Sequence, residues 1–276
     1  MIGDLLDSIR MQDYPAEKVH PFVIADNCSD NTADVALKHG AQVYTRHNTR
    51  KIGKGYALEK LLERIHQDHP EGYDAYLVFD ADNLLKEDYL KRMNESLNEG
   101  NDIVTSYRNS KNYASNWISA GYALWFLRES RFLNHPRNLL HSSCSVSGTG
   151  FCFTREVCEE LGGWPFHLLT EDIEFSVHEI IKGRKIAFCK DAELYDEQPV
   201  TFAQSCGSAC AGPRAIFRSS GNTGRTCFSA CVGDPSPAST CGTRSCRHLY
   251  CRSPRSSVTS LCPYTAESLG KTCGSL

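Results

Sequence analysis

Residues 1–205 predict an α/β domain, a mixed sheet of Rossmann type flanked by helices, with a disordered C-terminal tail after it. Three observations predict this class. Short apolar runs alternate with stretches whose apolar residues recur at helical spacing. A length of about 205 residues suits a single domain of this kind. The composition then changes sharply after Ser205. Alternating strands and helices favour a mainly parallel sheet, with ligands at the carboxyl ends of its strands.

Five short segments are predicted as strands because they are apolar and are bounded by polar or turn residues. Residues 75–79 are the clearest case, since an unbroken apolar run is typical of a strand buried on both faces. The first predicted strand, residues 22–25, leads into a polar stretch. The other candidates are residues 42–45, 102–107 and 185–189.

Helices are predicted where apolar residues recur every three or four positions. Residues 56–67 form an amphipathic helix on this pattern, and residues 173–181 form another that Gly183 can end. A helix after the first strand can end at Gly40. Residues 117–127 are apolar almost throughout, but these 11 residues are too few to cross a bilayer, which takes roughly 20. We therefore expect a buried or interfacial helix there.

Residues 206–276 differ in composition from the rest of the chain. They hold nine of the 14 cysteines, 13 serines and only two acidic residues, and their excess of Lys and Arg leaves a net charge of about −9 on residues 1–205. Few large aliphatic residues remain to form a core, and no helical or strand period persists. We therefore expect residues 1–205 to be the folded domain and residues 206–276 to be unstructured.

A cysteine-rich metal-binding module is the alternative interpretation of residues 206–276. Their cysteines include no Cys-x-x-Cys pair, which structural zinc sites usually supply. A secreted disulfide domain is disfavoured because no signal peptide pattern is seen. The five scattered cysteines of residues 1–205 favour reduced thiols, so we expect this chain to be cytoplasmic.

A loss of reading frame after Ser205 is the interpretation that we favour for this segment. Residues 206–224 can be back-translated with codons that, read from the third base, encode RQRMRWAKGYFQVFRKYG. That string contains a Gln-x-x-Arg-Trp signature. Because the codons were chosen freely, the nucleotide sequence of the gene is the test of this interpretation.

Two carboxylates follow the predicted strand 75–79. Asp80 and Asp82 lie on the same side of an extended chain, because successive side chains alternate. A carboxylate pair at a strand end suits Mg²⁺ or Mn²⁺, which take oxygen ligands and are shared with substrate phosphates. A turn with solvated carboxylates is the other interpretation, and this pattern alone does not decide between them.

Polar residues at two other element boundaries are candidate nucleotide contacts. Asp26 and Asp30 follow the first strand, where a carboxylate can bind a ribose or a base. Capping of the next helix accounts for one of them, which leaves Asp26 as the better candidate. Lys54 stands between two glycines, which let the backbone approach a diphosphate that the ammonium neutralises. An exposed basic turn is the alternative there.

Acidic residues also precede the predicted helix 173–181. Glu171 and Asp172 are either anions stabilised by the helix dipole or include a general base that takes a proton from an acceptor hydroxyl. A glycine-rich loop before them either lines a substrate or is a turn before a strand. That loop consists of Gly148, Thr149, Gly150 and Phe151.

The order of these motifs is more specific than any one of them. An Asp-rich turn, Gly-Lys-Gly, Asp-x-Asp, Gly-Thr-Gly-Phe and Thr-Glu-Asp occur in the order and rough spacing of the family 2 glycosyltransferases. Residues 1–205 resemble the cytosolic domain of the cellulose, chitin and hyaluronan synthase branch of that family. The Gln-x-x-Arg-Trp string of the shifted frame extends the resemblance.

The resemblance implies a GT-A fold that transfers a sugar from a UDP-sugar donor to a hydroxyl of a glycan acceptor, with inversion and with Mg²⁺ or Mn²⁺. Under it Asp172 would be the catalytic base with Glu171 as its neighbour, and residues 148–151 would face the acceptor. The contacts to the nucleotide-sugar would come from Asp26, Asp30, Lys54 and Asp80, and those to the metal from Asp80 and Asp82.

The chain departs from the pattern of that family at both ends. Met1 stands at a helix that normally follows a first, inner strand, so we expect unpaired backbone groups beside the missing strand. In the reading frame of this chain, the Gln-x-x-Arg-Trp motif and the membrane helices expected after it are missing. We therefore expect membrane contact only through segments absent from this chain.

These departures also predict impaired transfer by this chain. A remnant that binds UDP and a divalent metal without catalysis is the alternative function, and a cysteine-rich metal-binding protein is another. The formal net charge of −3 gives no reason to expect nucleic acid as a partner.

Overall fold

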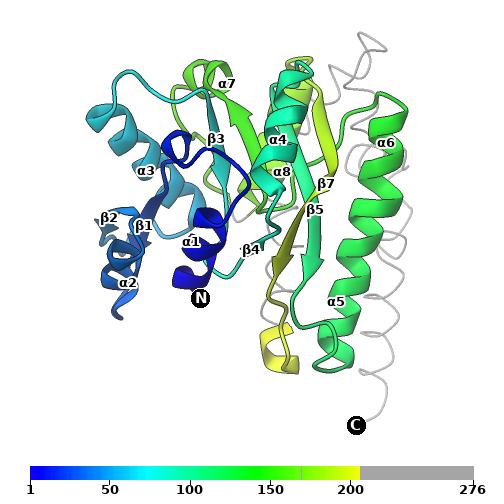
Figure 1. Cartoon of the computed structure of the whole chain (residues 1–276), viewed down its shortest axis with the longest axis horizontal. Helices are drawn as coiled ribbons and strands as arrows, with labels where there is room; N and C mark the ends of the chain where they lie inside the picture. The colour runs from blue at the N-terminus through cyan, green and yellow to red at the C-terminus, as the bar shows by residue number, and fades with distance from the viewer. Residues whose placement is uncertain (169, 206–276) are drawn as a thin grey trace, which may run out of the picture.

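The structure, a computed structural model, describes residues 1–168 and 170–205 (Figure 1). Helices flank a mixed sheet, which confirms the predicted α/β class. The predicted disorder and altered reading frame of residues 206–276 lie outside the described residues. The helices are α1 (Ile2–Arg10), η1 (Ala16–Lys18), α2 (Thr32–Lys38), α3 (Lys54–Asp68), α4 (Tyr89–Asn98), α5 (Trp117–Leu127), η2 (Arg128–Asn134), α6 (His135–Leu139), α7 (Arg155–Leu161) and α8 (Glu171–Ile181).

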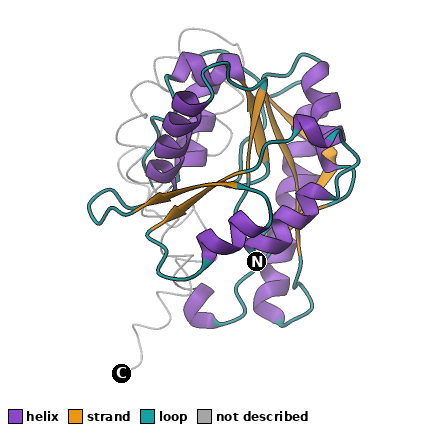
Figure 2. Cartoon of the chain, turned by 60° about the vertical axis from the view of Figure 1, so that its left-hand side comes forward, coloured by secondary structure: helices purple, strands orange, loops and turns teal. Residues whose placement is uncertain are grey.

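The strands form two separate sheets. One is the parallel pair of β1 (Phe22–Asp26) and β2 (Gln42–Arg46). The other has five strands in the order β3-β6-β5-β7-β4, and Figure 2 shows the β1–β2 pair set apart from it. Every predicted strand is present within a few residues. The five strands of the larger sheet are β3 (Ala75–Val78), β4 (Leu84–Leu85), β5 (Ile103–Ser110), β6 (Phe151–Thr154) and β7 (Ile186–Asp196).

The expectation of a mainly parallel sheet is wrong for the five-stranded sheet. Only β5 and β7 pair in parallel there, and the other three pairings are antiparallel. The cause is the connection before β6. After α6 the chain returns along the sheet without a helix or strand, bonding at the Cys144 N–H to Ile186 O and at the Gly150 N–H to Val78 O. β6 therefore enters antiparallel to both β3 and β5.

The apolar segment that begins at Trp117 is one continuous helical rod. α5 has the predicted bounds and continues through η2 into α6 (Figure 1). Asn116 caps it, since its side chain accepts hydrogen bonds from the backbone N–H of Ile118 and Ser119. Trp117 and Leu124 are mostly exposed, so this helix is not buried on that side. Among the residues placed in the structure, no helix is long and apolar enough to span a bilayer.

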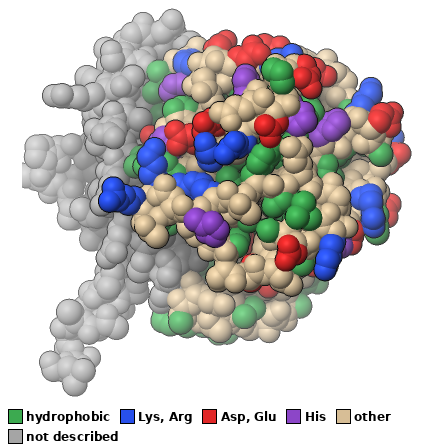
Figure 3. All heavy atoms as spheres, turned by 90° about the vertical axis from the view of Figure 1, so that its left-hand side faces the viewer, with side chains coloured by type: hydrophobic (Ala, Val, Ile, Leu, Met, Phe, Trp, Pro, Cys, Tyr) green, Lys and Arg blue, Asp and Glu red, His purple; other side chains and the backbone are tan. Residues whose placement is uncertain are grey.

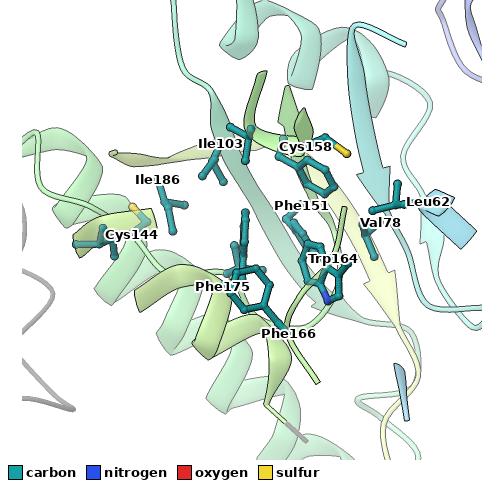
Figure 4. Close-up of a cluster of buried hydrophobic side chains, with 14 of the residues drawn as sticks. Leu62, Val78, Ile103, Cys144, Phe151, Cys158, Trp164, Phe166, Phe175 and Ile186 are labelled. Atoms are coloured by element: carbon teal, nitrogen blue, oxygen red, sulfur yellow. The ribbon is translucent and has the colours of Figure 1, made fainter. Parts of the chain in front are cut away.

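The main hydrophobic core lies between β6 and α8 (Figure 4). Phe151 and Phe153 of β6 pack against Trp164 and Phe175, with ring centroids between 5.7 and 6.0 Å apart. A second buried cluster covers the opposite face of the sheet, where α4 contributes Tyr89 and Met93. Aromatic clusters of this kind fix neighbouring elements rigidly. They hold in place the loop before β6 and the start of α8, which both carry candidate site residues.

The cysteines of the described part are free thiols. Burial raises the pKa of Cys144 and of Cys152 to about 12, so both stay protonated and pack as small apolar residues. Free thiols agree with the expectation for this part of the chain. They are Cys28, Cys144, Cys152, Cys158 and Cys189.

Two strand edges face each other without pairing. In the described residues β1 pairs only with β2, and β3 only with β6. Between them lies a cavity of about 1230 Å³, which is lined by residues of both strands.

Candidate functional site

The carboxyl end of β3 carries the Asp-x-Asp turn, and a network of hydrogen bonds fixes its backbone. The N–H of Asp80 donates to Oγ1 of Thr149 at 3.0 Å and to Oδ1 of Asn83 at 3.1 Å. The Thr149 hydroxyl donates in turn to the same Asn83 oxygen. Both polar partners are buried. These bonds fix the backbone of the turn that carries the two carboxylates, so the turn is not a loosely solvated loop.

Asp82 lies in an acidic environment. Burial, followed by the charges of Asp196 and Asp80, raises the pKa of Asp82 to about 6. Asp196 ends β7 and is neutralised by Arg108 at the end of β5. It also accepts a hydrogen bond from Asn83 Nδ2 at 3.0 Å. Carboxylates that repel one another in this way are stabilised by a divalent cation between them.

The donor set fits a divalent cation only in part. Within the described ranges there is no cluster of three or more His, Cys, Asp or Glu side chains arranged to hold a metal. Asp80 and Asp82 would supply two oxygen ligands. Mg²⁺ and Mn²⁺ commonly complete such a shell with water and with phosphate oxygens of a substrate. The residues thus suit a cation that binds together with a phosphorylated ligand.

Lys54 connects three parts of the site. Its Nζ donates to Asp80 Oδ1 at 2.5 Å and to the carbonyl oxygen of Gly148 at 2.7 Å. Lys54 is the first residue of α3, where the helix dipole also favours an anion. The ammonium and the helix start together form a cationic point beside the Asp-x-Asp turn.

Gly53 and Gly55, on either side of Lys54, are required for different structural reasons. Gly53 has a φ of +134°, which other residues rarely adopt. A Cβ on Gly55 would lie 2.0 Å from the carbonyl oxygen of Phe166. The close approach predicted for a diphosphate is therefore, at Gly55, a contact between α3 and the backbone of the loop before α8.

Asp26 lies at the carboxyl end of β1 and is mostly buried. Its carboxylate accepts a hydrogen bond from Arg46 Nη1 at 2.5 Å, and Arg46 also donates to the carbonyl oxygen of Lys51. Asp26 thereby connects both strand ends of the small sheet to the loop that leads to Lys54. Asp30 is exposed and accepts hydrogen bonds from the N–H and hydroxyl of Thr32. Asp30 thus bonds to the first residue of α2, although the N-cap position itself is Asn31 and carries no side-chain cap bond.

Glu171 and Asp172 are the first two residues of α8. Burial, followed by the charge of Asp172, raises the pKa of Glu171 to about 7. Burial also raises the pKa of Asp172, and the charge of Lys54 opposes both shifts. Two buried carboxyl groups of raised pKa beside a lysine are typical of acid–base sites. Ser176 anchors this helix start, since its hydroxyl donates to Asp172 O and accepts from the Val146 N–H.

The glycine-rich loop lies between these groups. A Cβ on Gly148 would lie 3.8 Å from Asp172 Oδ2 and 3.9 Å from Arg108 Nη1. Both side chains therefore lie close to Gly148. Thr149 contacts the Asp-x-Asp turn, as described above. Gly150 packs tightly, because a Cβ there would lie 2.0 Å from Leu194 Cδ2.

Phe151 does not face an acceptor, in contrast to what the sequence suggested. It is 1% exposed and belongs to the aromatic core, because it is the first residue of β6 and points between the sheet and α8. Thr149 and Gly150 are buried as well, so the substrate-lining interpretation applies to Gly148 only.

Three residues of the site were missed by sequence reasoning. Arg108, Asp196 and Asn83 connect the ends of β5, β7 and β3 through their ion pair and hydrogen bonds. The signal available was position, since Arg108 and Asp196 lie at the carboxyl ends of parallel strands. Their pairing with each other is visible only in the fold.

Comparison with known proteins agrees with this geometry. The family described as "Glycosyltransferase like family 2" matches residues 1–208. The chain is similar to "Probable glycosyltransferase YdaM" of Bacillus subtilis, with 24% identity over 68% of this chain and 46% of the relative. It is also similar to "Probable glucomannan 4-beta-mannosyltransferase 11" of Oryza sativa subsp. japonica, with 23% identity over 71% of this chain and 37% of the relative. The chain thus spans less than half the length of these curated relatives.

Solved structures share the fold. The mannosyltransferase PcManGT from Pyrobaculum calidifontis, in complex with GDP-Man and Mn²⁺, superposes with a TM-score of 0.58 at 17% identity, covering 86% of this chain and 73% of that one. S. aureus TarS 1–349 in complex with UDP-GlcNAc gives a TM-score of 0.53 at 15% identity, covering 74% and 56%. The family match extends over most of the chain, and so the protein belongs to the family 2-like glycosyltransferases.

Proposed function

We propose that this chain carries the donor and catalytic site of a glycosyltransferase that moves a sugar from a UDP-sugar to a hydroxyl of a glycan acceptor, with inversion at the anomeric carbon. The observation that carries this proposal is the convergence of Lys54, the Asp-x-Asp turn and the Asp172 helix start around Gly148. The ammonium group of Lys54, the candidate metal-binding pair of the Asp-x-Asp turn and the candidate base Asp172 lie there within hydrogen-bond reach of one loop.

The nucleotide half of the proposed donor site extends from Asp26 to Asp80. Asp26 would accept hydrogen bonds from the base, as a buried carboxylate at a strand end can. Lys54 would leave Asp80 for the diphosphate, which carries more negative charge than one carboxylate. Asp30 is proposed as a peripheral nucleotide contact, because its oxygen is already bonded to Thr32.

Asp80 and Asp82 fit a bound Mg²⁺ or Mn²⁺. When bound, the cation would act as a Lewis acid that stabilises the departing diphosphate. The chain itself contributes the rigid turn that Asn83 and Thr149 hold, so that little reorganisation is needed when the ligand arrives. The Mn²⁺ in the PcManGT complex supports this assignment.

Asp172 is proposed as the general base. A base must lie beside the acceptor hydroxyl, on the side of the sugar opposite the leaving diphosphate, if attack is to invert the anomeric centre. Asp172 fits because it borders Gly148, across from the Lys54–Asp80 pair. Its raised pKa brings its proton affinity closer to that needed near neutral pH. Glu171 would support it, and Gly148 would line the acceptor side.

The nature of the donor has a specific alternative. The rice relative is named a glucomannan mannosyltransferase, and the solved mannosyltransferase binds GDP-Man, so a GDP-sugar is a second candidate. The UDP and UDP-GlcNAc complexes of TarS favour the uridine nucleotide. The cellulose, chitin and hyaluronan synthase branch, action at the cytoplasmic face of a membrane, and a role in polysaccharide synthesis remain parts of the proposal.

A binding-only protein is the second candidate function. Lys54 neutralises Asp80 directly, and β1 with Asp26 belongs to a sheet separated from the one that carries Asp80. Such a chain would bind the nucleotide and metal without transfer. Nucleic acid is not proposed as a partner, because acidic and basic side chains are interspersed on the face that Figure 3 shows.

The test is a transfer assay on the purified chain with UDP- and GDP-sugars, oligosaccharide acceptors and Mn²⁺ or Mg²⁺. We expect metal-dependent release of one nucleoside diphosphate and loss of that release, by at least 100-fold, in Asp80→Asn. Asp191→Asn is the matched control, since Asp191 is an exposed carboxylate of β7. Equal activity of both variants would contradict the proposal. Metal-dependent nucleotide binding without turnover would select the binding-only function.

A further inference from the structure

Arg108 holds a guanidinium group at the edge of the candidate site, near the carboxyl end of β5. Its Nε and Nη2 donate to Asp196 Oδ2, and its Nη1 donates to the carbonyl oxygen of Ser147 at 3.0 Å. Helix α5 runs alongside β5 (Figure 1), and the ring centroid of its Phe126 lies 3.9 Å from Arg108 Cζ. Contacts with three different segments therefore fix the orientation of the guanidinium.

Two N–H groups of this guanidinium have no hydrogen-bond partner in the described part of the chain. A guanidinium carries five N–H donors, one on Nε and two on each terminal nitrogen. The bonds to Asp196 and Ser147 use one donor on each of the three nitrogens. One N–H therefore remains on Nη1 and one on Nη2. Because the Arg108 side chain is 19% exposed, a ligand can reach them.

The remaining donors lie close to the proposed base. Gly148 has no side chain, and the position that its Cβ would take is within 4 Å of both Arg108 Nη1 and Asp172 Oδ2. The two groups differ in polarity, since a guanidinium only donates hydrogen bonds and an ionised carboxylate only accepts them. A ligand that satisfies both must offer an acceptor and a donor close together. Neighbouring hydroxyl groups of a sugar ring do so.

The charges around Arg108 favour a neutral ligand. Asp196 is 2% exposed and neutralises Arg108 in the folded protein. An incoming anion would compete with that carboxylate and would also be repelled by Asp172. A neutral hydroxyl oxygen accepts a hydrogen bond from a charged donor and brings no further negative charge to the site. The remaining N–H groups of Arg108 thus suit sugar hydroxyls better than a carboxylate or a phosphate.

We propose that Arg108 is an acceptor-binding residue that selects neutral sugars, because its remaining N–H groups donate to a hydroxyl next to the one that faces Asp172. This role rests on the proposed glycosyltransferase function and adds a determinant of acceptor specificity to it. Phe126 and Asp196 hold the guanidinium in one orientation, so the bound sugar ring is held in one orientation as well. Arg108 thereby contributes to the choice of the acceptor hydroxyl that meets the base.

The test measures oligosaccharide binding, which does not depend on turnover. Cellotetraose, mannotetraose and chitotetraose are titrated separately into the full 276-residue chain, with and without Mn²⁺ and UDP or GDP, and binding is followed by NMR. Arg108→Lys keeps a positive charge beside Asp196 but lacks the planar group with its five donors. We expect at least one of the three neutral sugars to bind the wild type, and Arg108→Lys to weaken that binding at least tenfold.

Two further variants separate acceptor binding from folding. Phe126→Leu removes the ring that lies over the guanidinium but leaves its ion pair intact, and we expect at least threefold weaker binding. Arg184→Lys is the matched control, since Arg184 is 16% exposed and pairs with Glu179 beyond the end of α8 that is opposite to Asp172. We expect it to change oligosaccharide binding less than twofold. Circular dichroism checks the fold of each variant.

Nucleotide binding in the presence of Mn²⁺ should stay within threefold of the wild type in Arg108→Lys. The proposal is overturned if none of the three oligosaccharides binds, or if Arg108→Lys and Arg184→Lys weaken binding equally. It is also overturned if Arg108→Lys loses sugar and nucleotide binding together, because Arg108 then only supports the Asp-x-Asp turn. Tighter binding of tetragalacturonate, whose rings carry carboxylates, contradicts the selection of neutral sugars. Arg108-dependent sugar binding without nucleotide binding supports this role and contradicts the proposed transferase function.

Discussion

The two sheets of this protein carry different parts of the candidate site and differ in how extensively they are packed. The five-stranded sheet is covered on both faces by buried aromatic and aliphatic clusters, and its strand ends hold the Asp-x-Asp turn and Asp196. The β1–β2 pair carries Asp26 and has a smaller core of Leu6, Ala36 and Ala41. The comparison indicates that the Asp-x-Asp turn is held more firmly by its surroundings than Asp26 is.

Hydrogen bonding shows the same difference. Asp80 is bonded to Asn83 of the same turn and to Thr149 of the loop before β6, and Asn83 is bonded in turn to Asp196 of β7, so its geometry is fixed by contacts between distant segments. Asp26 is held mainly by Arg46, which belongs to its own small sheet. Rigid support of this kind is what catalysis requires, while a binding contact tolerates some motion.

The largest expected effect concerns Asp172, the proposed base. Asp172→Asn removes the proposed base while keeping the size of the side chain, and we expect the turnover rate to fall by roughly 100- to 10,000-fold. Because burial raises the pKa of Asp172, the wild-type rate should rise with pH as that carboxyl group loses its proton. Initial rates from pH 4 to 8 check both points, and an unchanged pH profile in the variant would exclude Asp172 as the base.

The next effect compares the stability of the two regions. Phe175→Ala opens a cavity in the fully buried aromatic core and should lower the free energy of unfolding by about 3–5 kcal/mol. Leu61→Ala removes a half-buried side chain that lines the cavity between β1 and β3 and should cost about 1 kcal/mol. Urea unfolding measures both. Similar losses would mean that the walls of this cavity are packed as densely as the core.

Glu171 gives a pH-dependent effect on stability. Its pKa is raised in the folded protein to about 7, so the folded state holds the proton more tightly than the unfolded chain does. The charged form therefore destabilises the fold as the pH rises from about 4.5 through 7. Glu171→Gln should unfold like the wild type near pH 4 and be more stable by about 2–3 kcal/mol at pH 8. A variant that is less stable at pH 8 would show that Glu171 is stabilised as an anion.

The smallest effect concerns helix α5. Asn116→Ala removes the cap of α5 and should lower the free energy of unfolding by about 1 kcal/mol. Nucleotide binding should not change, since α5 contributes no residue to the candidate donor site. Thermal unfolding and nucleotide titration of the same sample separate the two properties.

Much of this arrangement could be predicted from the sequence. Apolar runs and helical spacing located β1, β2, β3, β5 and β7 together with α2, α3, α5 and α8, because each buries a face that its periodicity reveals, whereas β4 and β6 were not predicted. The Asp-x-Asp turn, Lys54 and Asp172 were found because their motifs occur in the order of the family that the sequence resembles. Their convergence was inferred from the order of the motifs and is visible in the contacts of Lys54 with Asp80 and Gly148.

The remainder depends on contacts between distant segments. The antiparallel entry of β6 follows from bonds of an irregular segment to β3 and β7, which no local pattern encodes. The Arg108–Asp196 pair joins residues 88 positions apart. Phe151 looked like part of a loop because it follows glycines, and only the strand pairing shows that it is core.

The most direct measurement of the central proposal is calorimetric titration of the chain with UDP and with GDP, each with and without Mn²⁺. We predict that one nucleotide binds with an affinity that Mn²⁺ raises at least tenfold, and that Asp80→Asn removes the effect of the metal while Asp191→Asn does not. Nucleotide binding that is indifferent to Mn²⁺ and to Asp80, or no binding of either nucleotide, would contradict the assignment of this site.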